Sequence, residues 1–282
     1  MKIEQQWTEE IKSNHSLFAI NFKEIWQYRD LLRMLVIKEY ITFYKQTILG
    51  PIWFFVQPIL TTVIYVLLFG QIAKLGTDGS PQIAFYLSGI TLWNYFSESL
   101  TKTASVFRDN AAVMGKVYFP RLIMPLSIVV SGLMKFSLQF GLFICVILYF
   151  TFVKGLIHPN LWVLATPFLL LLMACFSLGL GMIFSALTTK YKDLVFLLTF
   201  GIQLLMYASP VIYSVAAIPE KYKWIIIANP LTGIIECFRY GFLGTGSFEP
   251  SSLVISTGIT VSILAVGVVI FNKVEKSFMD TV

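Results

Sequence analysis

The stretch FRDNAAVMGKVYFPR, residues 107–121, decides the fold because it is polar while the sequence on both sides is hydrophobic. Its charged and amide side chains are Arg108, Asp109, Asn110, Lys116 and Arg121. Each flanking hydrophobic run is long enough to cross a bilayer, so the polar stretch must lie in water at one membrane face. The chain is therefore a series of membrane spans joined by loops.

The composition supports an integral membrane protein. Of the 282 residues, 57% are hydrophobic and 13% are charged, against roughly 25% charged residues in a soluble domain. The alternating polarity of outer-membrane barrel strands is absent, which leaves helices as the spanning structure. The net charge of +6 comes from loops beside the hydrophobic runs, which favours contact with membrane lipids and argues against nucleic acid.

Six hydrophobic runs each reach roughly 30 Å at 1.5 Å per residue, enough to span a bilayer. We expect an all-α membrane protein with six transmembrane helices, at Ile52–Ala73, Ile83–Ser105, Leu122–Val153, Leu161–Leu187, Leu194–Tyr213 and Ser252–Phe271. An even number of spans places both termini on the same side. Fifteen Lys and Arg residues fall on that side and five on the other, so the positive-inside rule predicts cytoplasmic termini.

We divide the chain into a cytoplasmic N-terminal segment, residues 1–51, a six-span transmembrane domain, residues 52–273, and a cytoplasmic tail, residues 274–282. The charges of the N-terminal segment change side along a helix: those at 29–33 face one way and those at 38–45 nearly the opposite way. This pattern predicts an amphipathic helix in the membrane interface, bent or broken near Met34 to Ile37. A partly solvated helix packed on the other loops is an equal alternative.

Residues 214–246 are too apolar for a simple external loop. Their helical pieces, Glu220–Ala228 and Thr232–Leu243, are too short to span, and prolines separate them. Glu236 and Arg239 are spaced i, i+3 and can pair on one helix face. We expect a periplasmic re-entrant helical hairpin before the last span, buried in protein or lining a cavity.

Two of the runs carry polar and aromatic side chains on one helical face. They are Gln57, Thr61 and Tyr65 in the first run and Phe196, Phe200, Gln203 and Tyr207 in the fifth. A single phenylalanine more often packs or faces lipid, but an amide in hydrocarbon needs a polar partner or water. We predict that these two stripes line a substrate pathway, whereas a looser stripe from Phe136 to Phe150 serves packing.

Two charged residues, Glu98 and Lys135, lie inside hydrophobic runs. We favour a structural ion pair across adjacent spans over a proton relay. In the polar loop, 106–121, Asp109 or Asn110 is predicted to cap a short helix that Gly115 ends. The chain shows no phosphate-binding loop and no metal-binding motif, so we expect no catalytic residue, no metal and no bound cofactor.

Six segments in order resemble the permease subunit of ABC exporters for bacterial surface polysaccharides such as O-antigen, capsular polysaccharide and teichoic acid. They are YKQTILGPIW (44–53), LWNYF (92–96), VYFPRLIMP (117–125), KYKDL (190–194), SPVIY (209–213) and NPLTGIIECFRYGFLG (229–244). Each segment alone is a weak signal. Their order over most of the chain is specific.

The resemblance implies a homodimer in the bacterial inner membrane, joined by two copies of a separate ATPase that bind ATP and Mg²⁺. Lipid-linked polysaccharide would cross through a pore at the dimer interface. The ATPase would engage Arg108, Asp109, Asn110 and Lys116, with a second contact at Lys190 and Asp193. The short helices near Pro210, Pro230, Glu236 and Arg239 would form the outer gate, and Ile25 to Thr47 the interface helix.

Other functions remain open from the sequence. An ABC exporter of a small amphiphile or drug has a similar topology. A membrane-embedded glycosyl- or acyltransferase would need buried acid or base groups, of which the predicted spans offer only Glu98. A secondary transporter would normally show internal repeats and more charges at mid-membrane.

Overall fold

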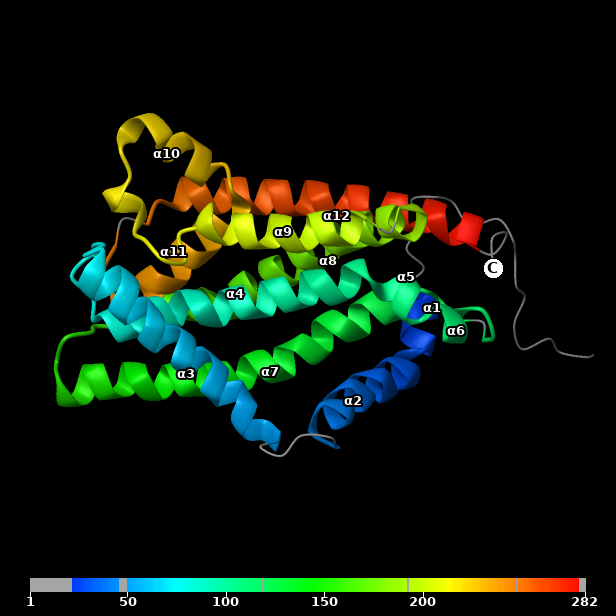
Figure 1. Cartoon of the computed structure of the whole chain (residues 1–282), viewed down its shortest axis with the longest axis horizontal. Helices are drawn as coiled ribbons and strands as arrows, with labels where there is room; N and C mark the ends of the chain where they lie inside the picture. The colour runs from blue at the N-terminus through cyan, green and yellow to red at the C-terminus, as the bar shows by residue number, and fades with distance from the viewer. Residues whose placement is uncertain (1–21, 46–49, 118, 192, 247, 279–282) are drawn as a thin grey trace, which may run out of the picture.

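The computed structural model describes residues 22–45, 50–117, 119–191, 193–246 and 248–278, and every regular element within them is a helix (Figure 1). Four helical stretches are long and apolar enough to cross a membrane: Trp53–Ile72, Ile123–Val153, Leu161–Lys190 and Pro250–Val274. They confirm the prediction of an all-α chain with spanning helices. Residues 1–21 of the predicted N-terminal segment and residues 279–282 of the predicted tail lie outside the described part of the chain.

The four stretches combine regular helices with shorter helical turns. The first follows the turn η1 (Gly50–Ile52) and joins α3 (Trp53–Tyr65) to the π-helical η2 (Val66–Ile72). The second joins α7 (Ile123–Leu148) to η3 (Tyr149–Val153). The third joins η4 (Leu161–Ala165) to α8 (Thr166–Lys190), and the last lies within α12 (Pro250–Phe278).

The other two predicted spans correspond to α4 (Gln82–Ala104) and α9 (Leu194–Tyr207). The 23 residues of α4 reach about 34 Å, but the helix carries Glu98, Lys102 and several hydroxyl side chains that lower its hydropathy. The 14 residues of α9 reach only about 21 Å. The count of six spans therefore stays a prediction.

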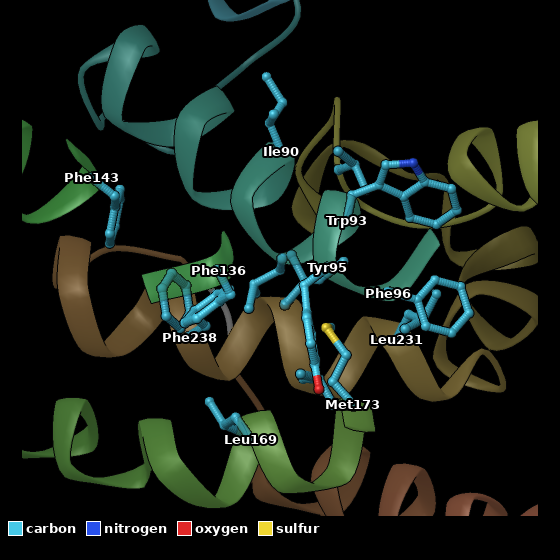
Figure 2. Packing of buried hydrophobic residues seen from close by; sticks show 14 of the residues in the cluster. Ile90, Trp93, Tyr95, Phe96, Phe136, Phe143, Leu169, Met173, Leu231 and Phe238 are labelled. Atoms are coloured by element: carbon cyan, nitrogen blue, oxygen red, sulfur yellow. The ribbon is translucent and has the colours of Figure 1, made fainter. Parts of the chain in front are cut away.

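Helix α4 forms the centre of the bundle, and side chains from α7, α8 and α11 (Pro230–Leu243) pack around it (Figure 2). Phe96 of α4 stacks on Phe176 of α8 with ring centroids 5.3 Å apart. Phe136 and Phe143 of α7 are buried in the same core. The prediction that the stripe on the third run serves packing is confirmed.

Helices α8 and α12 approach closely because glycines face each other. A Cβ atom added to Gly267 would lie 2.5 Å from the carbonyl oxygen of Gly179, and one added to Gly179 would lie 2.8 Å from the Cα atom of Leu264. Small residues of this kind let spanning helices pack backbone to backbone. This contact holds the last helix against the core.

The N-terminal helices differ from the prediction. Helix α1 (Phe22–Gln27) ends at a turn at Tyr28, and α2 (Arg29–Lys45) then continues without a break through 34–37. The predicted break near Met34 to Ile37 is wrong, because no Gly or Pro interrupts these residues and their hydrogen bonds can continue. Helix α2 packs on α7, while Met34 stays exposed. Residues 46 and 47 of the predicted interface helix are outside the described residues, and its position in the membrane interface stays a prediction.

The short elements gather at opposite ends of the bundle (Figure 1). Helices α5 (Val106–Asp109) and α6 (Ala111–Met114) lie at the end of the bundle where α12 ends. Helix α10 (Glu220–Ile227) lies with α11 at the other end, after the turn η5 (Val215–Ala217). The two short helices predicted within residues 214–246 are thus present, at the end of the bundle opposite α5 and α6.

Candidate functional site

The polar loop forms an elbow, which we define as residues 105–117. Its backbone makes two one-turn helices, α5 and α6, which meet at Asn110. The Asn110 amide donates a hydrogen bond back to the carbonyl oxygen of Val106 at 3.0 Å. The Asp109 carboxylate accepts from Arg108 Nε at 2.8 Å and from Ser105 Oγ at 2.5 Å.

These bonds correct the predicted helix cap. Asn110 occupies the N-cap position of α6, but no side-chain bond caps that helix. The Asp109 carboxylate instead accepts from Ser105 and Arg108, and the Asn110 amide turns back to donate to the Val106 carbonyl oxygen. Gly115 does follow the last residue of α6, as predicted.

The elbow is fixed to the bundle by its buried side chains. Phe107 stacks on Phe271 of α12 with ring centroids 4.6 Å apart, and Met114 is buried in the same cluster. The Thr188 hydroxyl, near the end of α8, donates a hydrogen bond to the carbonyl oxygen of Ala104 at 2.8 Å. The elbow is therefore anchored to α4, α8 and α12.

The outer surface of the elbow has an apolar centre and a charged rim. Val113 and Val117 are 45% and 59% exposed, and Arg108, Asp109 and Lys116 are exposed around them. Partial burial opposes ionisation of Asp109, but the hydrogen bonds from Arg108 and Ser105 outweigh this effect and hold the pKa of Asp109 below its ordinary value. An apolar centre with a charged rim is typical of protein-binding surfaces.

The turn between α8 and α9 lies beside the elbow, since α8 contacts α5. Lys190 and Asp193 are exposed there, and Lys190 Nζ lies 5.2 Å from the ring centre of Tyr191. The structure thus brings the two loops of the predicted ATPase contact to one end of the bundle. Lys192, in the same turn, is outside the described residues.

The aromatic stripe of α9 is open on the single chain. Phe196 is 80% exposed, and Phe200, Gln203 and Tyr207 are exposed on the same face. Tyr65, from the stripe of α3, donates its hydroxyl hydrogen bond to Met206 Sδ at 3.7 Å. Tyr65, the last residue of the α3 stripe, therefore contacts α9 beside Tyr207, the last residue of the other stripe.

Within the α3 stripe, Thr61 and Tyr65 already have partners in the chain. Gln57 is exposed, but the Thr61 hydroxyl already donates to the Gln57 carbonyl oxygen at 2.9 Å within the helix. Tyr65 also packs edge-on against Phe69 and Tyr86. Gln57 is thus the stripe's most accessible polar side chain.

At the outer end, Arg239 of α11 is almost fully buried and holds several elements together. Its guanidinium donates to the carbonyl oxygens of Val211 at 2.7 Å and Phe85 at 3.3 Å, and also to that of Pro210. It lies 3.7 Å from the ring centre of Phe85. The predicted ion pair with Glu236 is confirmed, with Arg239 Nη1 4.0 Å from Glu236 Oε1. The shorter bonds of Arg239 fix the turn after α9 to α4.

Asn229 and Gly89 complete this arrangement, and sequence reasoning did not include them among the functional residues. Asn229 caps α11 by accepting from the backbone N–H of Leu231, and its amide donates to the Ala208 carbonyl and the Ser209 hydroxyl. Gly89 leaves the space that Arg239 occupies. The Asn-Pro pair at the helix start was a usable signal for the cap, whereas the space beside Gly89 has no local signature. Pro230 begins α11 and, like Pro210, is buried.

Glu98 and Lys135 form an ion pair between α4 and α7, as predicted. Within the described part of the chain, no group of three His, Cys, Asp or Glu side chains could hold a metal ion. Glu98, the acid that a membrane-embedded transferase would need, is thus engaged by Lys135. This arrangement favours a structural role for Glu98.

The fold and the candidate site define the membrane subunit of a transporter. The chain has spanning helices, an exposed elbow that can receive a partner, and an open aromatic stripe. Residues 30–243 match the family described as ABC-2 type transporter, and the chain belongs to it. Two proteins named O-antigen export system permease protein RfbA from Klebsiella pneumoniae are 34% and 33% identical, each over 89% of this chain and 94% of their own length. A protein of the same name from Myxococcus xanthus is 28% identical over 92% of this chain and 98% of its length.

Proposed function

We propose that the chain is the permease of an ATP-driven exporter that moves lipid-linked, O-antigen-like polysaccharide across the bacterial inner membrane. The observation that carries this proposal is the match to O-antigen export permeases over nearly the whole chain. The elbow and the open aromatic stripe fit it, since one can receive an energy-supplying partner and the other can contact sugar.

The proposed topology has six spans, with α4 and α9 completing the four longer helices and both termini in the cytoplasm. The turn that follows α9 extends this helix toward the outer face. Helices α10 and α11 would form the re-entrant hairpin. Support comes from the burial of α11 within the protein, because short helices are tolerated at membrane depth only when protein covers them. Trp224 of α10 is exposed and suits the aromatic belt at the interface.

Energy would come from two copies of a separate ATPase that hold ATP and Mg²⁺, so this chain needs no cofactor of its own. The ATPase would dock on the elbow and on the adjoining turn with Lys190 and Asp193. Val113 and Val117 would fill an apolar depression, and Arg108 and Lys116 would meet acidic side chains. Closure of the ATPase pair would then push the elbow against α4, α8 and α12.

A second copy of the chain would face the open stripe of α9 and enclose the pathway. Phe196, Phe200 and Tyr207 offer ring faces for the apolar side of a sugar, and Gln203 offers a neutral amide for hydroxyl groups. Many weak contacts of this kind bind a long polymer without stopping it. The exposure of the whole stripe on one chain supports this assignment.

The test is an export assay in cells that lack the native permease and express its ATPase. The Asp109→Ala/Asn110→Ala double variant should insert normally and export less polysaccharide, because the bonds that shape the elbow are lost. The Gln203→Leu/Tyr207→Leu variant should also export less. Lys154→Gln and Ser262→Leu, exposed sites outside the elbow and the stripe, should match the wild type.

Each outcome bears on one part of the proposal. Unchanged export in the elbow variant would remove the coupling assignment, and full export in the stripe variant would return α9 to simple packing. Normal surface polysaccharide in cells without the permease, together with loss of resistance to a small amphiphile, would favour a drug exporter instead.

A further inference from the structure

Four charged side chains alternate in sign across three helices, and we define Glu39, Glu98, Lys102 and Lys135 as the charged joint. Lys102 Nζ lies 3.2 Å from Glu39 Oε2 of α2 and 3.2 Å from Glu98 Oε1, one turn earlier on α4. Glu98 Oε1 also contacts Lys135 Nζ of α7. One carboxylate thus receives two lysines, and one lysine joins two carboxylates.

The charged joint is partly shielded from water. The Lys135 side chain is 17% exposed, and its ammonium group lies 5.5 Å from the ring centre of Phe54 on α3. Tyr40 and Gly132 line the same small recess. Isolated surface ion pairs contribute little, but linked pairs shielded by protein are screened less. The charged joint can therefore hold α2, α4 and α7 in a fixed relation.

The charged joint is also connected to the elbow. Ser105 Oγ lies 3.3 Å from the carbonyl oxygen of Lys102 and 2.5 Å from Asp109 Oδ2, and its hydrogen can be donated to either. Asp109 in turn accepts from Arg108 on the exposed surface. Lys102 stands in the last turn of α4, three residues before the elbow begins. A displacement of the elbow along α4 therefore reaches Lys102 within one helical turn.

We propose that the charged joint transmits movement of the elbow to α2 and α7, with Lys102 as the positioning residue that links them. This proposal rests on the proposed function, in which an ATPase pushes the elbow. Ion pairs suit such a link because they keep their partners while the helices shift by small distances, whereas close apolar packing resists such a shift. Helix α2 would then move with the spans and not remain a passive anchor.

The test is a double-variant cycle in the exporter complex, purified with its own ATPase and reconstituted in vesicles. The variants are Glu39→Gln, Lys102→Gln and the two combined, and the readouts are ATP hydrolysis and polysaccharide transported per ATP. Each single variant should lower transport per ATP by about fivefold or more, the lower end of typical coupling. The combined variant should be no worse than Lys102→Gln alone, because Glu39 joins the charged joint only through its contact with Lys102.

The controls separate this proposal from its alternatives. Glu249→Gln and Lys273→Gln, exposed charges outside the charged joint, should keep the wild-type ratio. Melting curves of the purified complexes should coincide, which excludes loss through unfolding. Wild-type ratios in the single variants, or losses that multiply in the combined variant, would overturn the proposal. A wild-type complex that hydrolyses ATP without moving polysaccharide would instead contradict the proposed function.

Discussion

Replacing Gly89 by alanine should destabilise the protein, although helix propensity alone predicts the reverse. Within a helix, Gly→Ala ordinarily stabilises by about 0.5–1 kcal/mol. Gly89 is an interior residue of α4, but a Cβ atom added there would lie 2.7 Å from Arg239 Nη2 and 2.8 Å from the Val211 carbonyl oxygen. It would also lie 3.2 Å from the Cα atom of Val211. Two of these three atoms are backbone and cannot rotate away.

The size of the effect follows from what must move. Forcing an extra methyl group into a packed site costs about 1–3 kcal/mol. If the guanidinium withdraws, the buried Val211 carbonyl loses its 2.7 Å hydrogen bond, which costs about 1–3 kcal/mol more. After subtracting the gain in helix propensity, we expect a net loss of about 1–5 kcal/mol.

The measurement is the free energy of unfolding of the detergent-purified protein, from denaturant titration, with thermal melting as a second readout. Gly141→Ala is the matched control: Gly141 is interior to α7, and an added Cβ would meet nothing within 4 Å. It should be neutral or slightly stabilising. If Gly89→Ala melts at or above the wild-type temperature, the close approach of Arg239, Val211 and α4 is refuted as a structural constraint.

Two further substitutions test the packing of the helices in the same assays. Asn229→Ala should lower stability by about 1–2 kcal/mol because the cap of α11 is lost, whereas Asn229→Asp keeps the cap acceptor, lacks the amide donor and should lose less; equal losses would contradict a role for the cap. Gly267→Ala should cost about 1–3 kcal/mol because the new methyl group would meet the Gly179 carbonyl oxygen at 2.5 Å. Gly258→Ala on the same helix meets nothing within 4 Å and is its control, so equal melting of the two variants would argue against close packing of α8 and α12.

The sequence was sufficient for features that depend on hydropathy along the chain. The helical class, four of the spans and the two short helices after Pro210 follow from the length of apolar runs and the positions of prolines. The Glu98 to Lys135 pair was also predictable, because two opposite charges in consecutive hydrophobic runs are expected to pair. These features need no knowledge of which helices meet elsewhere.

Two kinds of feature were not predictable: the choice between competing local partners, and contacts between segments far apart in sequence. Asp109 and Asn110 rank among the best helix caps, yet the nearby donors of Ser105 and Arg108 compete for Asp109, and the Val106 carbonyl takes the Asn110 amide. Arg239 suggested an ion pair by its spacing, yet its carbonyl acceptors come from segments far apart in sequence. Local rules rank local partners and cannot see these distant ones.

The burial pattern at the outer end bears on which part of the proposed gate could move. A segment that moves readily must have few buried contacts to lose. Thirteen of the 14 residues of α11 are buried, and Arg239 ties it to α4 and to the turn after α9. Helix α10 has no buried residue. Under the proposed function, Pro210, Pro230, Glu236 and Arg239 therefore form the fixed frame of the outer exit, and α10 is the part that can swing to admit the polymer.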